Sequence, residues 1–574
     1  MKLHHLLTIV LLSSATIGVM SSCSDDENLG EAPRLFRPVA TLETNNNTIT
    51  ASWDNISGAT QYNLKLCRLV VDAEGTESYE DVTTATCASS PFTFEDLAWD
   101  EKYHVEISCS GNDKESKEYT TNDVNVNYLS SLTTSKMIDN AARISWKTDG
   151  DVIKAIVAVP QGDGESITVN VKETEYANGY KDIYGLTPET GYTFYTYKDG
   201  ETFDNDTYAG KLTGTTKASA DFDEMYGAGN WIDIRDWDLT AHADTLQKAE
   251  FWENITDGMT VILRGEQQYK VNNNIKFNRS VTFVTGATLG GNAVFVSSGG
   301  LTCASGATID KIKFEDIDFI SDKALNDANY AIAACKDKGF GGRQVLNNNG
   351  TKSTLKELIF KNCTITGYRA VVRAQAATDN INKIEFNGCV INGIGDQGVV
   401  TAADKGPDWR TINVINSTIT NIVTFCDLRK TVTPPTINIE NCTFCYAPIE
   451  TKANANTPMF RFLSNAAILN VSKTLFGPSL ATTGANGTEL NTYTPGNTAG
   501  SIFLNGASAQ VSVSKSFKTN FNWTVIGENL TYPLDGLQEL SFDETQLWQN
   551  PSEGDFKIIG NIGEDGIGDS RWKQ

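Results

Sequence analysis

The hydrophobic and polar positions between residues 311 and 476 repeat one short pattern. In each copy, alternating apolar side chains are followed by a polar residue, after which the alternation resumes with opposite phase; residues 357–367 and 383–393 show it most clearly. Further copies lie at 411–419 and 436–444, and a weaker one at 469–476. The apolar anchor of the pattern recurs in steps of 26, 28, 25 and 32 residues, at Phe360, Phe386, Val414, Ile439 and Val471. This near-constant period predicts stacked repeats and not a globular domain.

Each repeat is expected to contain strands joined by bends. Leu358 and Phe360 alternate with polar residues, as in a strand, and Cys363 and Ile365 do so with opposite parity. The phase changes at Asn362, a residue type that tolerates turn geometry. A third strand is expected in each repeat, at 330–337, 368–375, 397–404, 423–430, 458–465 and 500–507. Three strands per turn predict a right-handed parallel β-helix, with the anchors and the cysteines Cys363, Cys389 and Cys442 buried in columns.

From about Asp257 to the C-terminus, these strands resemble the pectate-lyase-like β-helix superfamily. The resemblance is specific for the fold and not for an activity. Residues 257–263 look like the first rung of many such domains, and residues 244–255 have the apolar spacing of a helix that caps the open end of the coil. Residues 554–572 resemble the terminal segment of β-helix lipoproteins from polysaccharide-utilisation systems of gut Bacteroidetes, and we expect them to form a closing strap.

Two segments before the β-helix resemble fibronectin type III domains. The first has a short strand ending at Trp53 and a Tyr103 that is expected to make the corner hydrogen bond of such sandwiches. The second has a matching strand ending at Trp146 and a closing segment at 185–194. Modules of this kind usually act as spacers. The expected fold class is therefore all-β, with two fibronectin type III-like sandwiches followed by a right-handed parallel β-helix.

The expected organisation starts with a lipoprotein signal. Lys2 precedes an apolar run from Leu6 to Val19, and Cys23 follows it as the residue that would be acylated. The acidic segment 24–27 resembles the surface-export tag of Bacteroidetes lipoproteins, which implies an outer-membrane lipoprotein facing the cell exterior. The alternative is a plain secretory signal with an incidental cysteine. The predicted segments are the signal peptide 1–22, a tether 23–33, sandwiches 34–128 and 129–217, a linker and cap 218–256, and the β-helix 257–574.

Charge and the scarcity of histidine remove several function classes. The formal net charge is −24, which argues against binding to nucleic acid and to anionic membrane surfaces. After the signal peptide only His104 and His242 remain, so the coil has no histidine for a Ser-His-Asp triad, a zinc site or a general base. An acidic chain that meets an acidic polymer needs local basic groups or a bridging cation.

Charged positions on the expected third strands are the remaining candidates for a site. The candidate substrate-binding residues are Tyr368, Arg369, Arg373, Arg429 and Arg461. Rungs of a β-helix lie about 4.8 Å apart, so such residues form a ladder, and arginine suits the carboxylates of uronate sugars. Lyases of the family use an Arg or Lys base with acids that hold calcium on this face. The resemblance thus makes Arg373 the candidate base and assigns Ca²⁺ to Asp396, Asp404 and Asp427.

Two functions compete on this evidence. The first is a non-catalytic surface protein that captures an acidic, pectin-like polysaccharide, together with other glycan-uptake proteins. The alternative is a polysaccharide lyase that cleaves by β-elimination next to a uronate. The enzyme signature motifs of the family are missing and the acids do not cluster on one rung, which favours binding. An adhesin or scaffold is a further alternative, and so is a face of solvated charges with no partner.

Overall fold

A computed structural model describes residues 34–573 of the chain. The segments outside the described residues are 1–33, 46, 73, 127–130, 151, 199–202, 204–207, 238–243, 337–339, 405, 451–457, 464, 482–503, 507, 522–533 and 574. Cys23, the tether and His242 therefore lie outside the described residues. Among the described residues, no helix has the length and apolar character that crossing a bilayer requires.

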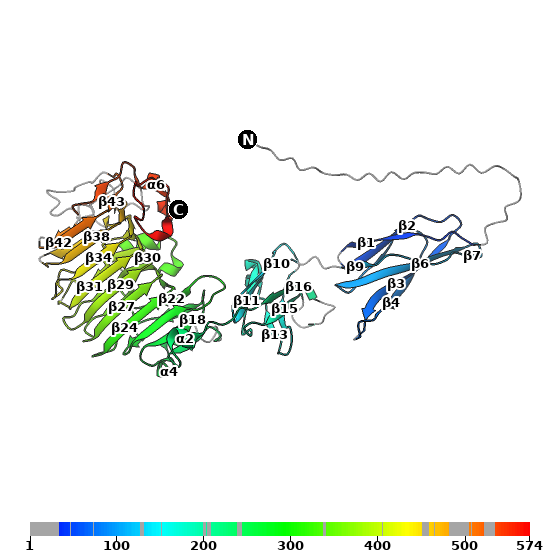
Figure 1. Cartoon of the computed structure of the whole chain (residues 1–574), viewed down its shortest axis with the longest axis horizontal. Coiled ribbons are helices and arrows are strands. Elements are labelled where there is room, and N and C mark those ends of the chain that lie inside the picture. Colours follow the sequence, from blue (N-terminus) through cyan, green and yellow to red (C-terminus); the bar gives the residue numbers. More distant parts are fainter. Residues whose placement is uncertain are drawn as a thin grey trace. The chain divides into compact units, whose positions relative to one another are not determined.

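The first domain is a β-sandwich (Figure 1). One sheet has the order β1-β2-β5 and the other β4-β3-β6-β7, with β8 and β9 also paired to β6. Their bounds are β1 Ala40–Asn45, β2 Thr48–Trp53, β3 Gln61–Val71, β4 Glu77–Cys87, β5 Phe92–Phe94, β6 Glu101–Gly111, β7 Lys114–Glu115, β8 Tyr119–Thr120 and β9 Val124–Val126. Trp53 is buried in the core, and the hydroxyl of Tyr103 accepts a hydrogen bond from Ala98 N at 3.1 Å. The predicted corner is therefore present.

The second domain repeats this arrangement with sheets β10-β11-β14 and β13-β12-β15-β16. The bounds are β10 Leu132–Met137, β11 Ala141–Trp146, β12 Ala155–Pro160, β13 Ile167–Asn170, α1 Glu173–Asn178, β14 Tyr180–Tyr184, β15 Gly191–Tyr197 and β16 Tyr208–Thr215. Trp146 is buried, and Tyr192 makes the equivalent corner by accepting from Thr187 N at 2.9 Å. Both domains are fibronectin type III-like, as predicted.

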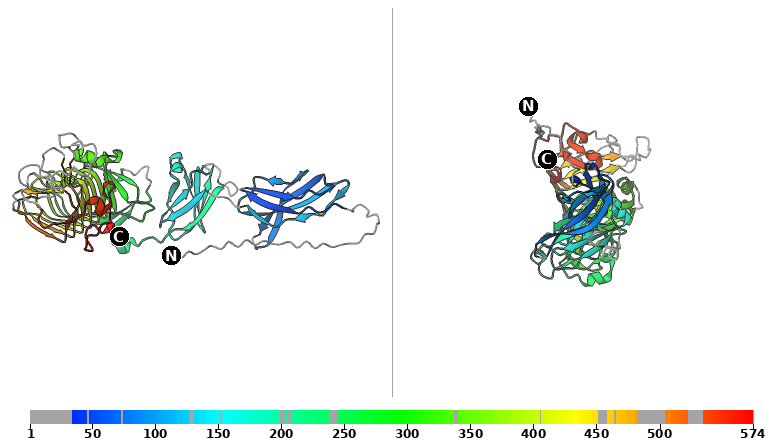
Figure 2. Two further views of the ribbon diagram at one scale, coloured as in Figure 1. Left: turned by 90° about the horizontal axis from the view of Figure 1, so that it is seen from above. Right: turned by 90° about the vertical axis from the view of Figure 1, so that its right-hand side faces the viewer.

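The rest of the chain is a parallel β-helix of about eight turns among the described residues, which confirms the expected fold class. Its first sheet has the order β17-β18-β21-β24-β27-β29-β31-β34-β38-β42, and the strands stack one above the next (Figures 1 and 2). The bounds are β17 Trp231–Asp233, β18 Met259–Leu263, β21 Val281–Thr285, β24 Thr308–Glu315, β27 Thr354–Lys361, β29 Asn380–Asn387, β31 Trp409–Ile415, β34 Thr436–Glu440, β38 Ile468–Ser472 and β42 Gln510–Ser514. Strand β17 pairs with β18, so the coil begins before the predicted first rung at Asp257.

The predicted anchors form one column in this sheet. Phe360 pairs in register with Phe386, which pairs with Val414, then Ile439 and then Val471. All five are buried. The rings of Phe360 and Phe386 stack with centroids 5.1 Å apart. The repeat alignment made from the sequence is thus confirmed in its register.

The bend that follows each of these strands is set by a left-handed residue. Asn362 has φ +52°, and the residues at the same bend in later turns are Gly388, Asn416 and Asn441, with φ of +67°, +47° and +53°. This conformation is open to glycine and tolerated by asparagine, whose short polar side chain bonds locally. The change of phase in the sequence pattern therefore marks a real corner of the coil.

The second sheet begins after this bend, with the order β19-β22-β25-β28-β30-β32-β35-β39-β43-β44. The bounds are β19 Gln268–Val271, β22 Ala293–Ser297, β25 Ile317–Ser321, β28 Thr364–Ala374, β30 Val390–Thr401, β32 Thr418–Ile422, β35 Thr443–Cys445, β39 Leu475–Phe476, β43 Phe517–Lys518 and β44 Gln538–Glu539. Cys363, Cys389 and Cys442 lie buried just before these strands, and Ser417 takes the same position in one turn. The Cys389 thiol donates to Phe360 O at 3.3 Å and the Cys442 thiol to Val414 O at 3.4 Å, so these cysteines tie one turn to the previous one.

The third strands form a branch of the second sheet that pairs β26, β28, β30, β33, β37 and β41. The additional bounds are β26 Gln344–Asn348, β33 Cys426–Asp427, β37 Phe460–Leu463 and β41 Leu504–Gly506. The prediction of a strand at 330–337 is wrong, because Tyr330–Lys336 is the helix α5 and β26 supplies the third strand of that turn. The segment is rich in alanine, which favours a helix. Gly393 makes room for α5, since a Cβ there would lie 2.9 Å from Ala331 Cα.

Apolar residues close the N-terminal end of the coil. The segment expected to cap it consists of η1 Thr245–Gln247 and α4 Ala249–Glu253, preceded by α2 Phe222–Tyr226 in the linker. Leu246, Phe251 and Ile255 are buried in the same core as the first rungs. The ring of Trp252 packs edge-on against Phe277 and Phe283. These contacts shield the first core layer from water.

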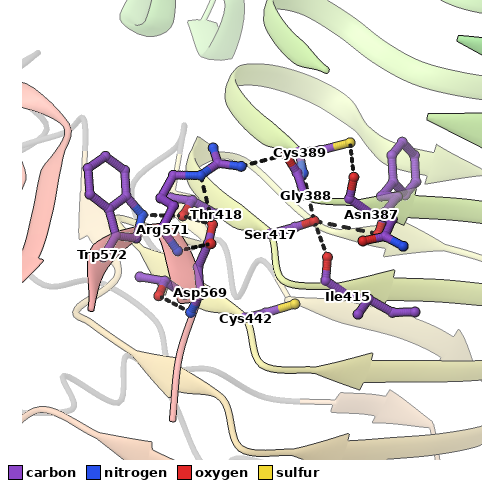
Figure 3. A network of polar contacts seen from close by, with 12 residues as sticks. Asn387, Gly388, Cys389, Ile415, Ser417, Thr418, Cys442, Asp569, Arg571 and Trp572 are labelled. Carbon is purple, nitrogen blue, oxygen red and sulfur yellow. Dashed lines mark hydrogen bonds and ion pairs between the residues drawn. The ribbon is translucent and has the colours of Figure 1, made fainter. Parts of the chain in front are cut away.

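The C-terminal segment lies along the second sheet and crosses several turns of it (Figure 3). Its elements are α6 Glu544–Leu547, β45 Trp548–Asn550, η4 Pro551–Glu553, β46 Asp555–Ile558 and η5 Ser570–Trp572. Asp569 is buried, accepts from the Thr418 hydroxyl at 2.8 Å, and donates from its backbone N to the Thr443 hydroxyl at 3.2 Å. Trp572 Nε1 donates to the same Thr418 hydroxyl at 2.7 Å, and Arg571 donates to Gly388 O. The segment thus joins neighbouring turns from outside.

Candidate functional site

The third strands carry one polar column in register. Asn347 pairs with Arg373, Arg373 with Thr401, Thr401 with Asp427, and Asp427 with Arg461. In these strands the neighbours Val372, Ala374, Phe460 and Phe462 are buried, so the alternation directs the polar residues outward. We call Arg373, Asp427 and Arg461, with Arg429 beside them, the arginine ladder.

Asp427 is the one carboxylate at the centre of the arginine ladder. Its Oδ2 lies 3.3 Å from Arg429 Nη2 and 3.4 Å from Arg461 Nη1. Its Oδ1 is buried and has no hydrogen-bond partner among the described residues. Burial raises the pKa of Asp427, and the two arginines offset that effect only in part. Both contacts are long for charge-assisted hydrogen bonds, so the carboxylate holds the arginines loosely.

The arginines of the ladder have donors to spare. The Nε atoms of Arg373, Arg429 and Arg461 are all buried and, in the part of the chain that the structure describes, all lack a hydrogen-bond partner. Arg373 donates from Nη1 to Asn347 Oδ1 at 2.9 Å, and the ion pairs found in the described residues give it no carboxylate. Burial and the nearby Arg369 lower the pKa of Arg373, while Asp404 raises it. Since buried polar groups are usually satisfied, this surplus is unusual.

Arg369 stands apart from the ladder and is already paired. It sits at a register shift between Tyr368 and Ala370. Its Nε and Nη2 donate to the two oxygens of Asp396 at 2.6 and 3.0 Å, which is a two-pronged ion pair. Two satisfied partners have little left to offer a ligand, so the structure separates Arg369 from Arg373, Arg429 and Arg461.

The sequence predicts Tyr368 on the outer face of the coil, but the structure does not place it there. It is fully buried in the core of the coil, and its hydroxyl lies 2.7 Å from the Ser297 hydroxyl. The cause is Gly367, whose φ of +68° changes the phase of β28 and turns Tyr368 inward. The prediction of Tyr368 as a binding residue is therefore wrong.

The three proposed calcium ligands are not brought together. Asp396 is paired with Arg369, Asp427 with two arginines of the ladder, and Asp404 is exposed. Among the described residues, three or more His, Cys, Asp or Glu ligand atoms lie within 4.8 Å of one another only in the first sandwich. Calcium prefers six to eight oxygen ligands, which this arrangement does not provide. The calcium assignment does not fit these residues.

Sequence reasoning missed two members of the polar column, Asn347 and Thr401. Asn347 was overlooked because the third strand of its turn was placed on the alanine-rich segment that forms α5. The sequence did contain a signal for Asn347, because two asparagines follow the apolar pair Val345 and Leu346 at the end of the segment 344–348. Thr401 carries no charge and gave no signal of its own. Its position follows only from the register of β30 with β28 and β33.

Comparison with known proteins adds little to this geometry. No protein-family model matches the chain, and no curated protein matches it. Among solved structures, a two-domain fibronectin type III segment from chicken tenascin is 15% identical, covers 32% of this chain and 99% of its own length, and has a TM-score of 0.16. The FN1–FN3 domains of chicken CNTN1 are 14% identical, with 32% of this chain and 65% of that chain covered and a TM-score of 0.14.

Proposed function

We propose that this chain is a cell-surface lipoprotein whose β-helix binds an acidic, pectin-like polysaccharide along the arginine ladder. The observation that carries the proposal is the cluster of three half-exposed arginines, Arg373, Arg429 and Arg461, in which Arg429 and Arg461 share the Asp427 carboxylate through long contacts of 3.3 and 3.4 Å. Arginine presents a planar fork of N–H donors that matches a carboxylate, and it is the residue that most often recognises one. A uronate would supply the acceptors that the ladder lacks.

The charge and the spacing of the ladder favour a polymer as its ligand. Arg429 and Arg461 share the one carboxylate of Asp427, and Arg373 has no ion-pair partner among the described residues, although the chain as a whole has a formal net charge of −24. The ladder is therefore a local exception to a field that repels anions. Arg429 and Arg461 lie on neighbouring rungs, which are about 4.8 Å apart, and Arg373 lies two rungs before Asp427. The arginines therefore extend over several rungs and suit an extended chain better than one compact anion.

The lipid-anchor segment and the two sandwiches that precede the β-helix also fit this proposal. Cys23 would carry the lipid that anchors the protein in the outer membrane, facing the cell exterior, and the two sandwiches would act as spacers. The repeat pattern of the coil supports membership of the pectate-lyase-like superfamily, and the acidic segment after Cys23 supports an origin in Bacteroidetes. Other glycan-uptake proteins would receive the captured polymer.

One observation favours a second function, polysaccharide lyase. Burial lowers the pKa of Arg373, and its Nε has no partner. A base that abstracts the proton next to a uronate carboxylate must be poised in this way. An adhesin or scaffold, in which the polar column contacts another protein, is the alternative if no polysaccharide binds.

The test measures binding and turnover in the same samples. The purified protein is run in affinity gels with a panel of pectins while the absorbance of unsaturated uronate is followed. We expect Arg373→Ala and Arg461→Ala each to weaken binding by about 10- to 100-fold, which corresponds to about 1.5–3 kcal/mol for a charge-assisted contact. The effect should shrink as salt is added. Arg410→Ala is the matched control, because Arg410 is an exposed arginine of the first sheet that is paired with Asp408.

The outcomes separate the functions. Loss of binding in both ladder variants, with no turnover in the parent protein, supports capture. Turnover that disappears in Arg373→Ala while binding falls only modestly identifies a lyase, and its sensitivity to a chelator reports whether calcium takes part. Binding that is equal in Arg373→Ala, Arg461→Ala and Arg410→Ala, with no turnover at any pH, would rule out the ladder in both functions.

A further inference from the structure

The first sandwich contains a buried cluster of metal-binding side chains on the outer face of one sheet. The antiparallel register of β3 and β6 places Cys67 opposite His104 and Lys65 opposite Glu106. One ligand atom from each of Cys67, His104 and Glu106 lies within 4.8 Å of the other two. Neighbouring side chains on this face alternate with core residues such as Leu66 and Val105, so the cluster is separate from the hydrophobic core.

His104 is held as a metal-binding histidine would be. Its side chain is only 7% exposed, and its Nδ1 lies 3.4 Å from Asp123 Oδ1. The ring of Tyr79 covers it at 4.3 Å between centroids, and the Tyr79 hydroxyl donates to Asp123 Oδ2 at 2.8 Å. A histidine that binds a metal through one nitrogen usually donates from the other to a carboxylate. Asp123 is placed for that contact.

The second nitrogen of His104 is left without a partner. Nε2 is buried, has no hydrogen-bond partner among the described residues, and lies 3.8 Å from Glu106 Oε1, which is beyond hydrogen-bonding distance. With the proton of a neutral imidazole on Nδ1, the lone pair of Nε2 faces a carboxylate oxygen. Two electron-pair donors that face each other across 3.8 Å in a buried site form a favourable place for a cation.

We propose that Cys67, His104 and Glu106 bind a divalent transition-metal ion of the zinc class, with Asp123 as the positioning residue. A thiolate, an imidazole and a carboxylate are a ligand set typical of zinc, and calcium and magnesium prefer oxygen alone. A tetrahedral ion with bonds of about 2.0–2.3 Å needs ligand atoms roughly 3.3–3.8 Å apart, so small side-chain rotations close the cluster. The fourth position takes a water molecule, and binding releases the thiol proton to solvent.

Lys65 is the internal competitor of the metal. Its ammonium contacts Glu106 directly and lies 3.6 Å from Asp81 Oδ1. When an ion binds Glu106, Lys65 keeps Asp81 as its partner and can turn away from the site. Asp81 also accepts from the Cys67 thiol at 3.6 Å, so it becomes free for Lys65 once that proton has left. The cluster thus has a stable metal-free state and a route to the bound one.

The test is a titration of the full chain carrying Cys23→Ala, after treatment with EDTA, with Co²⁺ as a spectroscopic probe and Zn²⁺ as competitor. We expect one equivalent of Co²⁺ per chain, a thiolate-to-cobalt charge-transfer band, and loss of the band when Zn²⁺ is added. Cys67→Ser should abolish the band, whereas Cys87→Ser, in the neighbouring strand β4 of the same sandwich, should leave it unchanged. Glu106→Gln should weaken binding, and Asp123→Asn should weaken it by about 10- to 100-fold while the band remains.

A thermal measurement guards against variants that fail to fold. Zn²⁺ should raise the Tm of the parent protein, because a ligand of the folded state stabilises it by mass action, and should raise the Tm of Cys67→Ser and Glu106→Gln clearly less. Circular dichroism in EDTA checks that the variants are folded. A parent protein that binds less than half an equivalent of Co²⁺, or a band that persists equally in Cys67→Ser and Cys87→Ser, would overturn the proposal.

Discussion

Phe386→Ala tests the stacked core on which the whole β-helix depends. Phe386 is fully buried and lies between Phe360 in one turn and Val414 in the next. Removing its ring forfeits about 1.5–3 kcal/mol of hydrophobic burial and about 0.5–1.5 kcal/mol of ring stacking with Phe360. The backbone ladders keep the turns about 4.8 Å apart, so the cavity cannot collapse and adds its own cost. We expect a total loss of about 3–5 kcal/mol in the free energy of unfolding.

The measurement is urea unfolding of the full chain, followed by far-ultraviolet circular dichroism and compared with the parent protein. Phe386→Leu is the matched control and should lose less, because Val414 and Ile439 show that an aliphatic side chain fits the same column. A loss below about 1 kcal/mol for Phe386→Ala would mean that the turns do relax around the missing ring. The solenoid would then be held mainly by its hydrogen-bond ladders and the reasoning on core columns would be refuted.

Three further predictions follow from single residues. Cys389→Ser should lower the free energy of unfolding in urea by less than about 1 kcal/mol. The reason is that Ser417 occupies the same position in the next turn, where its hydroxyl accepts from Cys389 N at 3.0 Å. A larger loss would show that the column needs sulfur. Asp427 has a raised pKa in the folded protein, so the native state binds the extra proton and the free energy of unfolding falls as pH rises through that pKa. Asp427→Asn should remove this dependence of stability on pH. An unchanged pH profile in the variant would contradict the raised pKa of Asp427. Cys23→Ala should release the protein from membranes in cell fractionation, and its retention there would argue against a lipid anchor.

The core of the β-helix could be predicted from the sequence because its determinants are local. The alternation at Phe360 and Phe386 and the phase change at Asn362 are each visible within a few residues, and the structure places them in the expected column and corner. The wrong prediction of a strand at 330–337 also came from local pattern, because the alanine-rich segment of α5 was assigned the strand alternation of the neighbouring repeats. Tyr368 was misplaced because one left-handed glycine reverses the side to which a strand residue points.

The arginine ladder was harder to predict because register, and not sequence interval, defines it. Arg373, Thr401, Asp427 and Arg461 follow the anchor of their turn by 13, 15, 13 and 22 residues. The hydrogen bonds between strands nevertheless keep Asp427 opposite Arg461, whatever the number of residues in the turn. Counting therefore locates the buried column, in which every turn carries an apolar residue, but not a polar column of mixed types. A solenoid can thus change the length of a turn without disturbing a site that spans it, and this separation lets the ladder keep the spacing that we expect an extended acidic polymer to require.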